Sequence, residues 1–160
     1  MKTILVMVLL FSNLFGFAQQ KIIGKWKPVY FSMDKIISGD IKAGKAILSD
    51  TVEVMFKDDK DPSASKELMH MMAEIMLEKM KNNEQEFLLP DIYIETEKKR
   101  NSTDKGTFTF DDATNLLNIK TATKAIMFIV SFNNDHLILT GELESRKGKK
   151  GALVIEYEKI

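Results

Sequence analysis

The chain contains no cysteine, and this absence excludes several classes of site. Without thiols there is no thiolate metal site, no cysteine nucleophile and no lipid-modified cysteine of a bacterial lipoprotein. Disulfides are excluded too, so a small exported domain of this composition needs a hydrophobic core that is sufficient alone. Excess charge is also absent: 23 Lys and Arg balance 23 Asp and Glu, which gives no general attraction to nucleic acid or anionic membranes.

Long apolar runs are absent apart from one near the start of the chain. Residues 4–11 are all apolar, and the small residue Ala18 precedes the polar Gln19. The run is too short to span a bilayer and is typical of a secretory signal peptide. We therefore expect residues 1–18 to be a cleaved signal peptide, residues 19–160 to be one domain, and the product to be secreted or periplasmic, with no membrane span.

Most of the remaining chain has the alternation of apolar and polar residues that is typical of β-strands. The predicted strands are residues 26–33, 51–56, 91–97, 106–110, 115–120, 125–132, 136–143 and 152–158. Short turn-like links join the later strands, which indicates antiparallel hairpins in series. The sequence therefore predicts a mainly β fold, an antiparallel up-and-down eight-stranded barrel without exposed edges. Residues 34–50 fit a lid, a short helix or a further strand.

One segment has a helical pattern instead. Asp61 and Pro62 are a typical cap and first-turn pair, and Asn82 can end a helix. Between them, apolar residues recur every three or four positions, which predicts one amphipathic helix inserted into the barrel sequence. Its apolar stripe is expected to face the barrel and consists of Met69, Met72, Met76 and Met80.

Aligned methionines have two interpretations. Thioether sulfurs, often together with His, bind Cu(I) in exported proteins. His70, however, falls about 100° from the stripe on the polar face, so no mixed Met and His cluster forms on this helix. Methionine also fills irregular cores and lines adaptable pockets. We therefore interpret the stripe as core or pocket lining and predict no metal site and no cofactor.

Two polar motifs have structural interpretations beside catalytic or metal-binding ones. Residues 58–61 carry the oxygen ligands that Ca²⁺ prefers, but they lack the turn glycine and the closing glutamate of a calcium loop. We interpret them as a helix cap and a solvated loop. Asp135 and His136 resemble half of a catalytic triad, yet no serine lies in a nucleophile-elbow setting. We expect a hairpin turn and a strand side chain there, and no enzymatic activity.

Two further motifs are expected at the surface and need no partner to explain them. Residues 146–150 form a basic hairpin tip that solvation alone explains. Asn101 begins a glycosylation sequon, which matters only in a eukaryotic host.

The only tryptophan lies in "IIGKW", and the pair Gly24 and Trp26 resembles the Gly-x-Trp signature of lipocalins. The segments "GTFTFDDATNLLNIK" and "FIVSFNNDHLILTGELESRKGKKGALVIEYEKI" are similar to lipocalin-like exported proteins of Bacteroidetes-type bacteria. The Thr-Asp-Tyr signature of lipocalins is absent, and the helix falls early in the chain rather than after the barrel. In that family the Trp packs across the closed end of the barrel, usually under an Arg from a late strand, which by position would be Arg146. We expect Trp26 to be buried there, with its indole N–H on a backbone carbonyl or polar group.

The resemblance implies non-enzymatic binding of a small hydrophobic molecule inside the barrel. Gly24 and Trp26 are then a structural signature. The candidate pocket or core residues are Met72, Met76, Phe108, Phe110, Phe128 and Tyr157. The alternative is a protein-interaction module with a solid barrel, which uses the Met-rich helix or the basic tip to contact a partner. An empty interior of about 300 Å³ or more favours ligand binding, and a filled one favours the interaction module.

Overall fold

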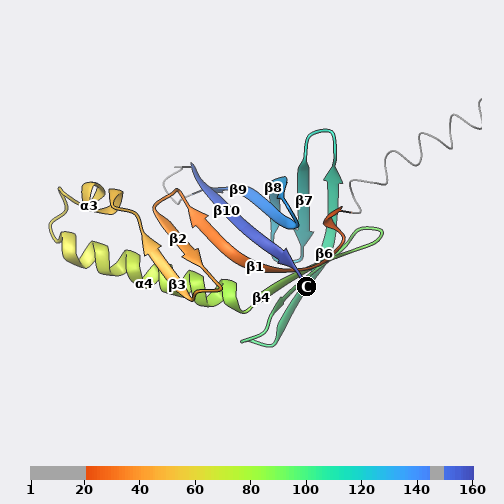
Figure 1. Ribbon diagram of the computed structural model, residues 1–160, viewed down its shortest axis with the longest axis horizontal. Helices are drawn as coiled ribbons and strands as arrows, with labels where there is room; N and C mark the ends of the chain where they lie inside the picture. Colours follow the sequence, from red (N-terminus) through yellow and green to blue (C-terminus); the bar gives the residue numbers. More distant parts are fainter. Residues whose placement is uncertain (1–20, 145–149) are drawn as a thin grey trace, which may run out of the picture.

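The computed structural model describes residues 21–144 and 150–160 (Figure 1). The predicted signal peptide, and residues 146–149 of the basic tip, lie outside the described residues. The elements in chain order are β1 (Gly24–Met33), β2 (Ile37–Asp40), β3 (Lys45–Leu48), α3 (Thr51–Met55), α4 (Pro62–Lys81), β4 (Asn83–Leu88), β5 (Ile92–Glu97), β6 (Ser102–Asp111), β7 (Leu116–Thr121), β8 (Ala125–Asn133), β9 (His136–Glu144) and β10 (Lys150–Lys159).

Eight antiparallel strands form a closed barrel. Strands β4 to β10 follow one another as an up-and-down meander, and β1 closes the barrel by pairing with both β4 and β10. Trp26 of β1 lies opposite Gln85 on one side and Lys159 on the other. The predicted antiparallel eight-stranded barrel is therefore confirmed.

Strand β1 also pairs with a hairpin that lies outside the barrel. Its first residues pair with β4, whereas Tyr30–Met33 pair with β2 along the same edge. The register of β1 against β10 shifts between Pro28 and Tyr30, and Pro28 suits this irregular point because it has no N–H to donate. The β2–β3 hairpin thus extends the sheet, as the orange strands of Figure 1 show. This hairpin occupies most of residues 34–50, which the sequence alone left open.

Helix α4 lies along the β2–β3 hairpin and covers one of its faces (Figure 1). The side chain of Asp61 accepts a hydrogen bond from the Ala64 N–H at 3.0 Å, Pro62 is the first helical residue, and Asn82 is the C-cap. The predicted bounds of the helix are confirmed because each follows from capping chemistry.

The predicted face of α4 was wrong at Met72, whose side chain is 42% exposed. The buried face is centred on Ala73 and Leu77, and Met69, Met76 and Met80 flank it as partly buried residues. The small side chain of Ala73 lets the helix approach the sheet closely, which moves the line of contact away from Met72. The surface that this face covers is mainly the β2–β3 hairpin rather than the barrel.

Two predicted strands also need correction. Residues 51–56 contain the short helix α3, not a strand, because alternation over so few residues does not distinguish a strand from a turn and a half of helix. Only Val52 of this segment is buried, and Val54 and Met55 are exposed, so no strand face is present. Strand β4 was missed, because its inward-facing positions begin with the polar residues Asn83 and Gln85. The predicted number of barrel strands holds because β4 takes the place of the strand predicted at 51–56.

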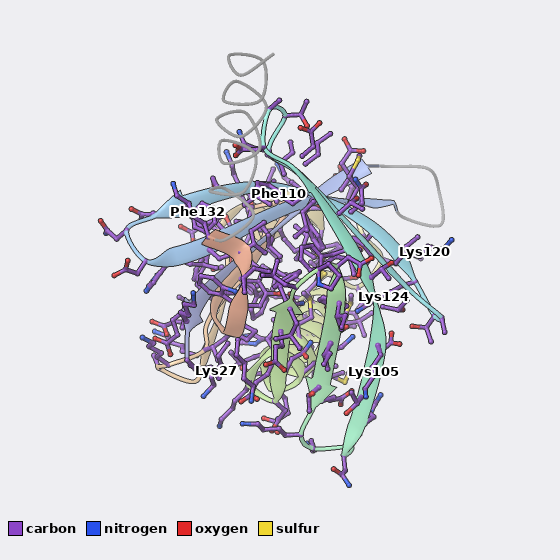
Figure 2. The ribbon with its side chains drawn as sticks, turned by 90° about the vertical axis from the view of Figure 1, so that its right-hand side faces the viewer. Lys27, Lys105, Phe110, Lys120, Lys124 and Phe132 are labelled. Atoms are coloured by element: carbon purple, nitrogen blue, oxygen red, sulfur yellow. The ribbon has the colours of Figure 1, made fainter. Side chains whose placement is uncertain are left out.

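The apolar part of the barrel interior is built from aromatic and aliphatic side chains of almost every strand. The ring of Phe87 lies 5.3 Å from that of Tyr93 and 5.1 Å from that of Phe108, the latter edge to face. Such contacts are favourable beyond the area that they bury. Figure 2 shows side chains occupying the space that the strands enclose. Among the described residues, no helix has the length and apolarity needed to cross a membrane.

Candidate functional site

One end of the barrel is closed around Trp26. Trp26 is 2% exposed, and its Nε1–H donates to the carbonyl oxygen of Ile22 at 2.7 Å. Lys159 places its Nζ 5.4 Å from the centre of the indole ring, within the range of a cation–π contact. Gly24 has φ +134°, a backbone conformation that other residues adopt only with strain, so glycine is favoured at this position. The predicted burial of Trp26 and its bond to a backbone carbonyl are confirmed.

The opposite end of the barrel is polar on its inner side. Asn83 starts β4, whereas Glu95 and Thr121 lie near the ends of β5 and β7, so all three belong to the strand ends opposite Gly24. Gln85 lies between them and Trp26, its partner in the pairing of β1 with β4. Asn83, Gln85 and Phe87 alternate along β4, and Phe87 belongs to the aromatic cluster inside the barrel. The two amides therefore face the barrel interior as well.

Glu95 is the centre of this polar end. Its carboxylate accepts from Asn83 Nδ2 at 2.7 Å and from the Tyr93 hydroxyl at 3.3 Å, and it forms an ion pair with Lys124. Burial alone would raise the pKa of Glu95, but the hydrogen bonds from Lys124 and Asn83 outweigh burial and lower it. Lys124 lies on the side of the barrel where β6 and β7 run (Figure 2). The carboxylate is thus ionised at neutral pH and is already fully engaged.

A second carboxylate lies beside the first, because Asp104 is opposite Glu95 in the pairing of β5 with β6. It accepts from the hydroxyls of Thr121 and Thr123, each at 2.7 Å. These hydrogen bonds lower the pKa of Asp104. The polar end therefore holds two carboxylates and one lysine.

Two acceptor atoms at this end have no hydrogen-bonding partner within the described protein, Asn83 Oδ1 and Gln85 Oε1. Both residues are only 7% exposed. The orientation of the Asn83 amide is fixed, because a carboxylate such as Glu95 only accepts and so must face the NH₂ group. A buried acceptor without a donor costs about 1–3 kcal/mol, so two of them side by side are unusual in a small core.

Two tyrosines connect the polar end with the apolar interior. Burial raises the pKa of both Tyr93 and Tyr157, and the charge of Glu95 raises them further. Their hydroxyls are therefore neutral at any physiological pH. They offer hydrogen bonds to a bound molecule but no base.

The structure brings most of the predicted site residues together. Phe108, Phe128 and Tyr157 are buried in one cluster, and Phe110 and Met76 pack against it. Met72 is the exception, since it lies on the exposed side of α4. Sequence reasoning missed the polar residues Asn83, Gln85, Glu95 and Lys124. The available signal was the short run 83–88. Its first four residues are polar, so polar side chains occupy both the inward and the outward positions of the strand.

The other motifs have ordinary structural surroundings. Asp135 lies in the turn between β8 and β9, and His136 is a β9 residue whose Nδ1 lies 2.5 Å from Glu156 Oε1. In the part of the chain that the structure describes, no group of three or more His, Asp or Glu residues is arranged to hold a metal ion.

A groove of about 750 Å³ runs outside the barrel, between α4 and the turn that joins β5 to β6. Its floor includes Met71, Ile75 and Leu77, and its rim carries ion pairs such as Glu78 with Lys99 at 3.1 Å. The exposed apolar residues of α4 continue beside it and follow the spacing i, i+3, i+4, i+7: Leu68, Met71, Met72 and Ile75.

Comparison with known proteins adds one structural similarity. No family model and no curated protein matches the sequence. Among solved structures, the chain is similar to a DUF4847 family protein from Bacteroides vulgatus, with a TM-score of 0.48 and 12% identity over 88% of this chain and 96% of that one. Similarity at this level carries no argument about function.

Proposed function

We propose that the protein binds a small, mostly apolar molecule inside its barrel and does not transform it. The observation that carries this proposal is the pair of unpartnered acceptors, Asn83 Oδ1 and Gln85 Oε1, which face the interior next to an aromatic wall. A donor group on a bound molecule would supply the hydrogen bonds that the protein itself does not supply. The resemblance of "IIGKW" to lipocalins supports the same function.

The apolar part of the ligand would contact the aromatic residues that the sequence analysis selected. Phe108, Phe128 and Tyr157 lie in the barrel core, and Phe110 lies at its margin. Eight-stranded barrels of this size hold one small ligand when their side chains leave room for it. Side chains occupy the space that the strands enclose (Figure 2), so a ligand would enter by displacing some of them. Barrel binding by an exported protein also agrees with the signal-peptide pattern of residues 1–18, and we retain a secreted or periplasmic location as part of the proposal.

The absence of a transformation is supported by the state of the two carboxylates. Glu95 is paired with Lys124, and Asp104 accepts from two threonines. The pKa of each is lowered, which makes each a weaker base than an ordinary carboxylate. Neither is suited to act as a general base or acid near neutral pH.

The proposal is tested by titrating the purified protein with Nile red, a neutral probe without hydrogen-bond donors, and by native mass spectrometry for stoichiometry. Adjacent residues of β8 provide a matched pair, because Phe128 faces the interior and Met127 faces solvent. We expect one probe per chain. Phe128→Ala should lower the affinity for the probe about tenfold or more, and Met127→Ala should keep the wild-type affinity. Equal effects of the two variants, or no saturable binding, would reject binding inside the barrel.

A second candidate function is contact with another protein through α4. It is favoured by the exposed stripe Leu68, Met71, Met72 and Ile75, whose spacing is that of helices that dock into apolar grooves. Met71→Ser together with Ile75→Ser would then abolish a complex formed by the intact protein, as followed by analytical ultracentrifugation, and would leave Nile red binding unchanged.

A further inference from the structure

We infer that the molecule bound in the barrel carries a protonated primary amine as its polar head group, and that the polar end around Asn83 and Gln85 recognises it. This inference rests on the proposed function and specifies the chemical class of the ligand. Its starting point is the kind of atom that lacks a partner. Asn83 Oδ1 and Gln85 Oε1 are carbonyl oxygens, which only accept hydrogen bonds, so the complementary group on the ligand must donate.

An ammonium group is the donor that fits two acceptors on one strand face. Asn83 and Gln85 are two positions apart on β4 and so lie next to each other on the inner side of the wall. An ammonium has three N–H donors and no acceptor, so it can serve both amide oxygens and still have one donor left. The hydroxyl of Tyr157 or Tyr93 is a neutral acceptor for that third bond.

The charges at this end favour the same choice. Glu95 and Asp104 carry two negative charges, and Lys124 supplies one positive charge that is already paired with Glu95. Glu97, opposite Asn83 in the pairing of β4 with β5, forms an ion pair with Arg100 that is neutral as a whole. The net charge facing a head group is therefore negative, which attracts a cation and repels a carboxylate.

A carboxylate head group would find no suitable partner here. It would face two carbonyl oxygens and two carboxylates, with Lys124 held by Glu95. Lys159 lies across Trp26 from Gln85, and its ammonium is engaged over the indole ring of Trp26. The site therefore discriminates against fatty acids by charge and by the type of hydrogen-bonding atom.

The experiment compares three ligands with the same chain and different head groups, dodecylamine, dodecanol and dodecanoate, as competitors of Nile red at pH 7 and below their micellar concentrations. In the wild-type protein we expect the amine to bind about tenfold or more tightly than the carboxylate, with the alcohol between them. Gln85→Met removes one acceptor with little change in shape and should reduce the amine preference about tenfold. Glu86→Met, on the neighbouring position of β4 and outside the network, should leave the preference intact.

The possible outcomes separate this inference from the proposed function. Saturable Nile red binding with dodecanol or dodecanoate equal to or better than dodecylamine overturns the amine head group and leaves barrel binding in place. An amine preference that is unchanged in both Gln85→Met and Asn83→Leu also overturns it, because the amides are then not the recognition site. If Nile red itself does not bind, the proposed function has failed. The ranking in the wild-type protein decides the question even if a variant does not fold.

Discussion

Lys159 lies opposite Trp26 in the pairing of β1 with β10, and its ammonium nitrogen is 5.4 Å from the centre of the indole ring. In the lipocalins that "IIGKW" resembles, an Arg from a late strand usually lies over this tryptophan, and Arg146 is the residue of this chain that would correspond by position. Arg146 lies outside the described residues, and the cation that the structure places over the ring is a lysine from the last strand. The relationship identifies Trp26 as a structural plug, held by a contact on its face and a hydrogen bond at its edge.

Trp26→Ala should lower the free energy of unfolding by about 3–5 kcal/mol, because it removes a large buried aromatic side chain. Trp26→Phe keeps most of the ring and should cost about 1–3 kcal/mol, chiefly because the carbonyl of Ile22 loses its donor. Urea denaturation followed by circular dichroism measures both values. Nile red affinity of the folded fraction should change little. Normal stability combined with lost binding would place Trp26 in the ligand site.

The buried face of α4 predicts a large difference in stability between lysine substitutions on its two sides. Leu77→Lys should destabilise the protein by several kcal/mol, because it buries an unpaired charge between the helix and the β2–β3 hairpin. Met72→Lys, one and a half turns away on the exposed side, should change stability by less than about 0.5 kcal/mol. Thermal melts of both variants provide the measurement. Similar losses for the two would show that α4 is rotated from the position described.

Features controlled by local chemistry could be predicted from the sequence, and those controlled by distant contacts could not. The ends of α4 follow from Asp61, Pro62 and Asn82, which act on neighbouring backbone groups. The rotation of α4 depends instead on Ala73 and on the hairpin that it meets, which helical periodicity does not contain. Methionine positions alone therefore placed the contact line too close to Met72.

Strand β4, which carries part of the candidate site, could not be predicted from the sequence either. Its inward residues Asn83 and Gln85 are polar, and its outward residue Glu84 is buried between Lys25 and Lys98. Both faces thus contradict the usual alternation of a barrel strand. The residues that hide β4 from pattern analysis are the residues that make the candidate site. The aromatic residues Phe108, Phe128 and Tyr157 were found because they follow the ordinary pattern.

The close approach of β6 and β7 depends on Gly106. A Cβ at this position would overlap the carbonyl oxygen of Lys120 on the neighbouring strand, and backbone cannot move aside as a flexible side chain can. Gly106→Ala should therefore cost about 1–3 kcal/mol. Thr107→Ala, at the adjacent exposed position, is the matched control and should cost much less. Chemical denaturation of the two variants is the measurement, and equal losses would argue against close strand contact.

Glu84 should make stability depend on pH. The residue is 4% exposed, and burial alone would raise its pKa, but hydrogen bonds from Lys25 and Lys98 lower it overall. A carboxylate with a lowered pKa contributes stability above its unfolded pKa, about 4.3, and loses that contribution as the pH falls through its folded pKa.

Glu84→Gln should therefore be less stable than wild type at pH 7, by about 1–3 kcal/mol. The difference should shrink towards zero as the pH falls from about 5 to 3. Unfolding curves recorded across this range provide the measurement, with Glu86→Gln as a control on the same strand. A difference that stays constant with pH would mean that the charge of Glu84 is not what stabilises this part of the barrel.

The pairing of β1 with β10 also has a consequence for how the chain folds. The first and the last strands are neighbours in the barrel, so the contact that closes it joins residues from opposite ends of the sequence. Contacts of such long range form slowly, because much of the chain must be ordered before they are made. Until β10 arrives, the edges of β1 and β9 remain open to pairing with other chains. During biosynthesis the barrel is therefore most vulnerable to aggregation immediately before its last ten residues join it.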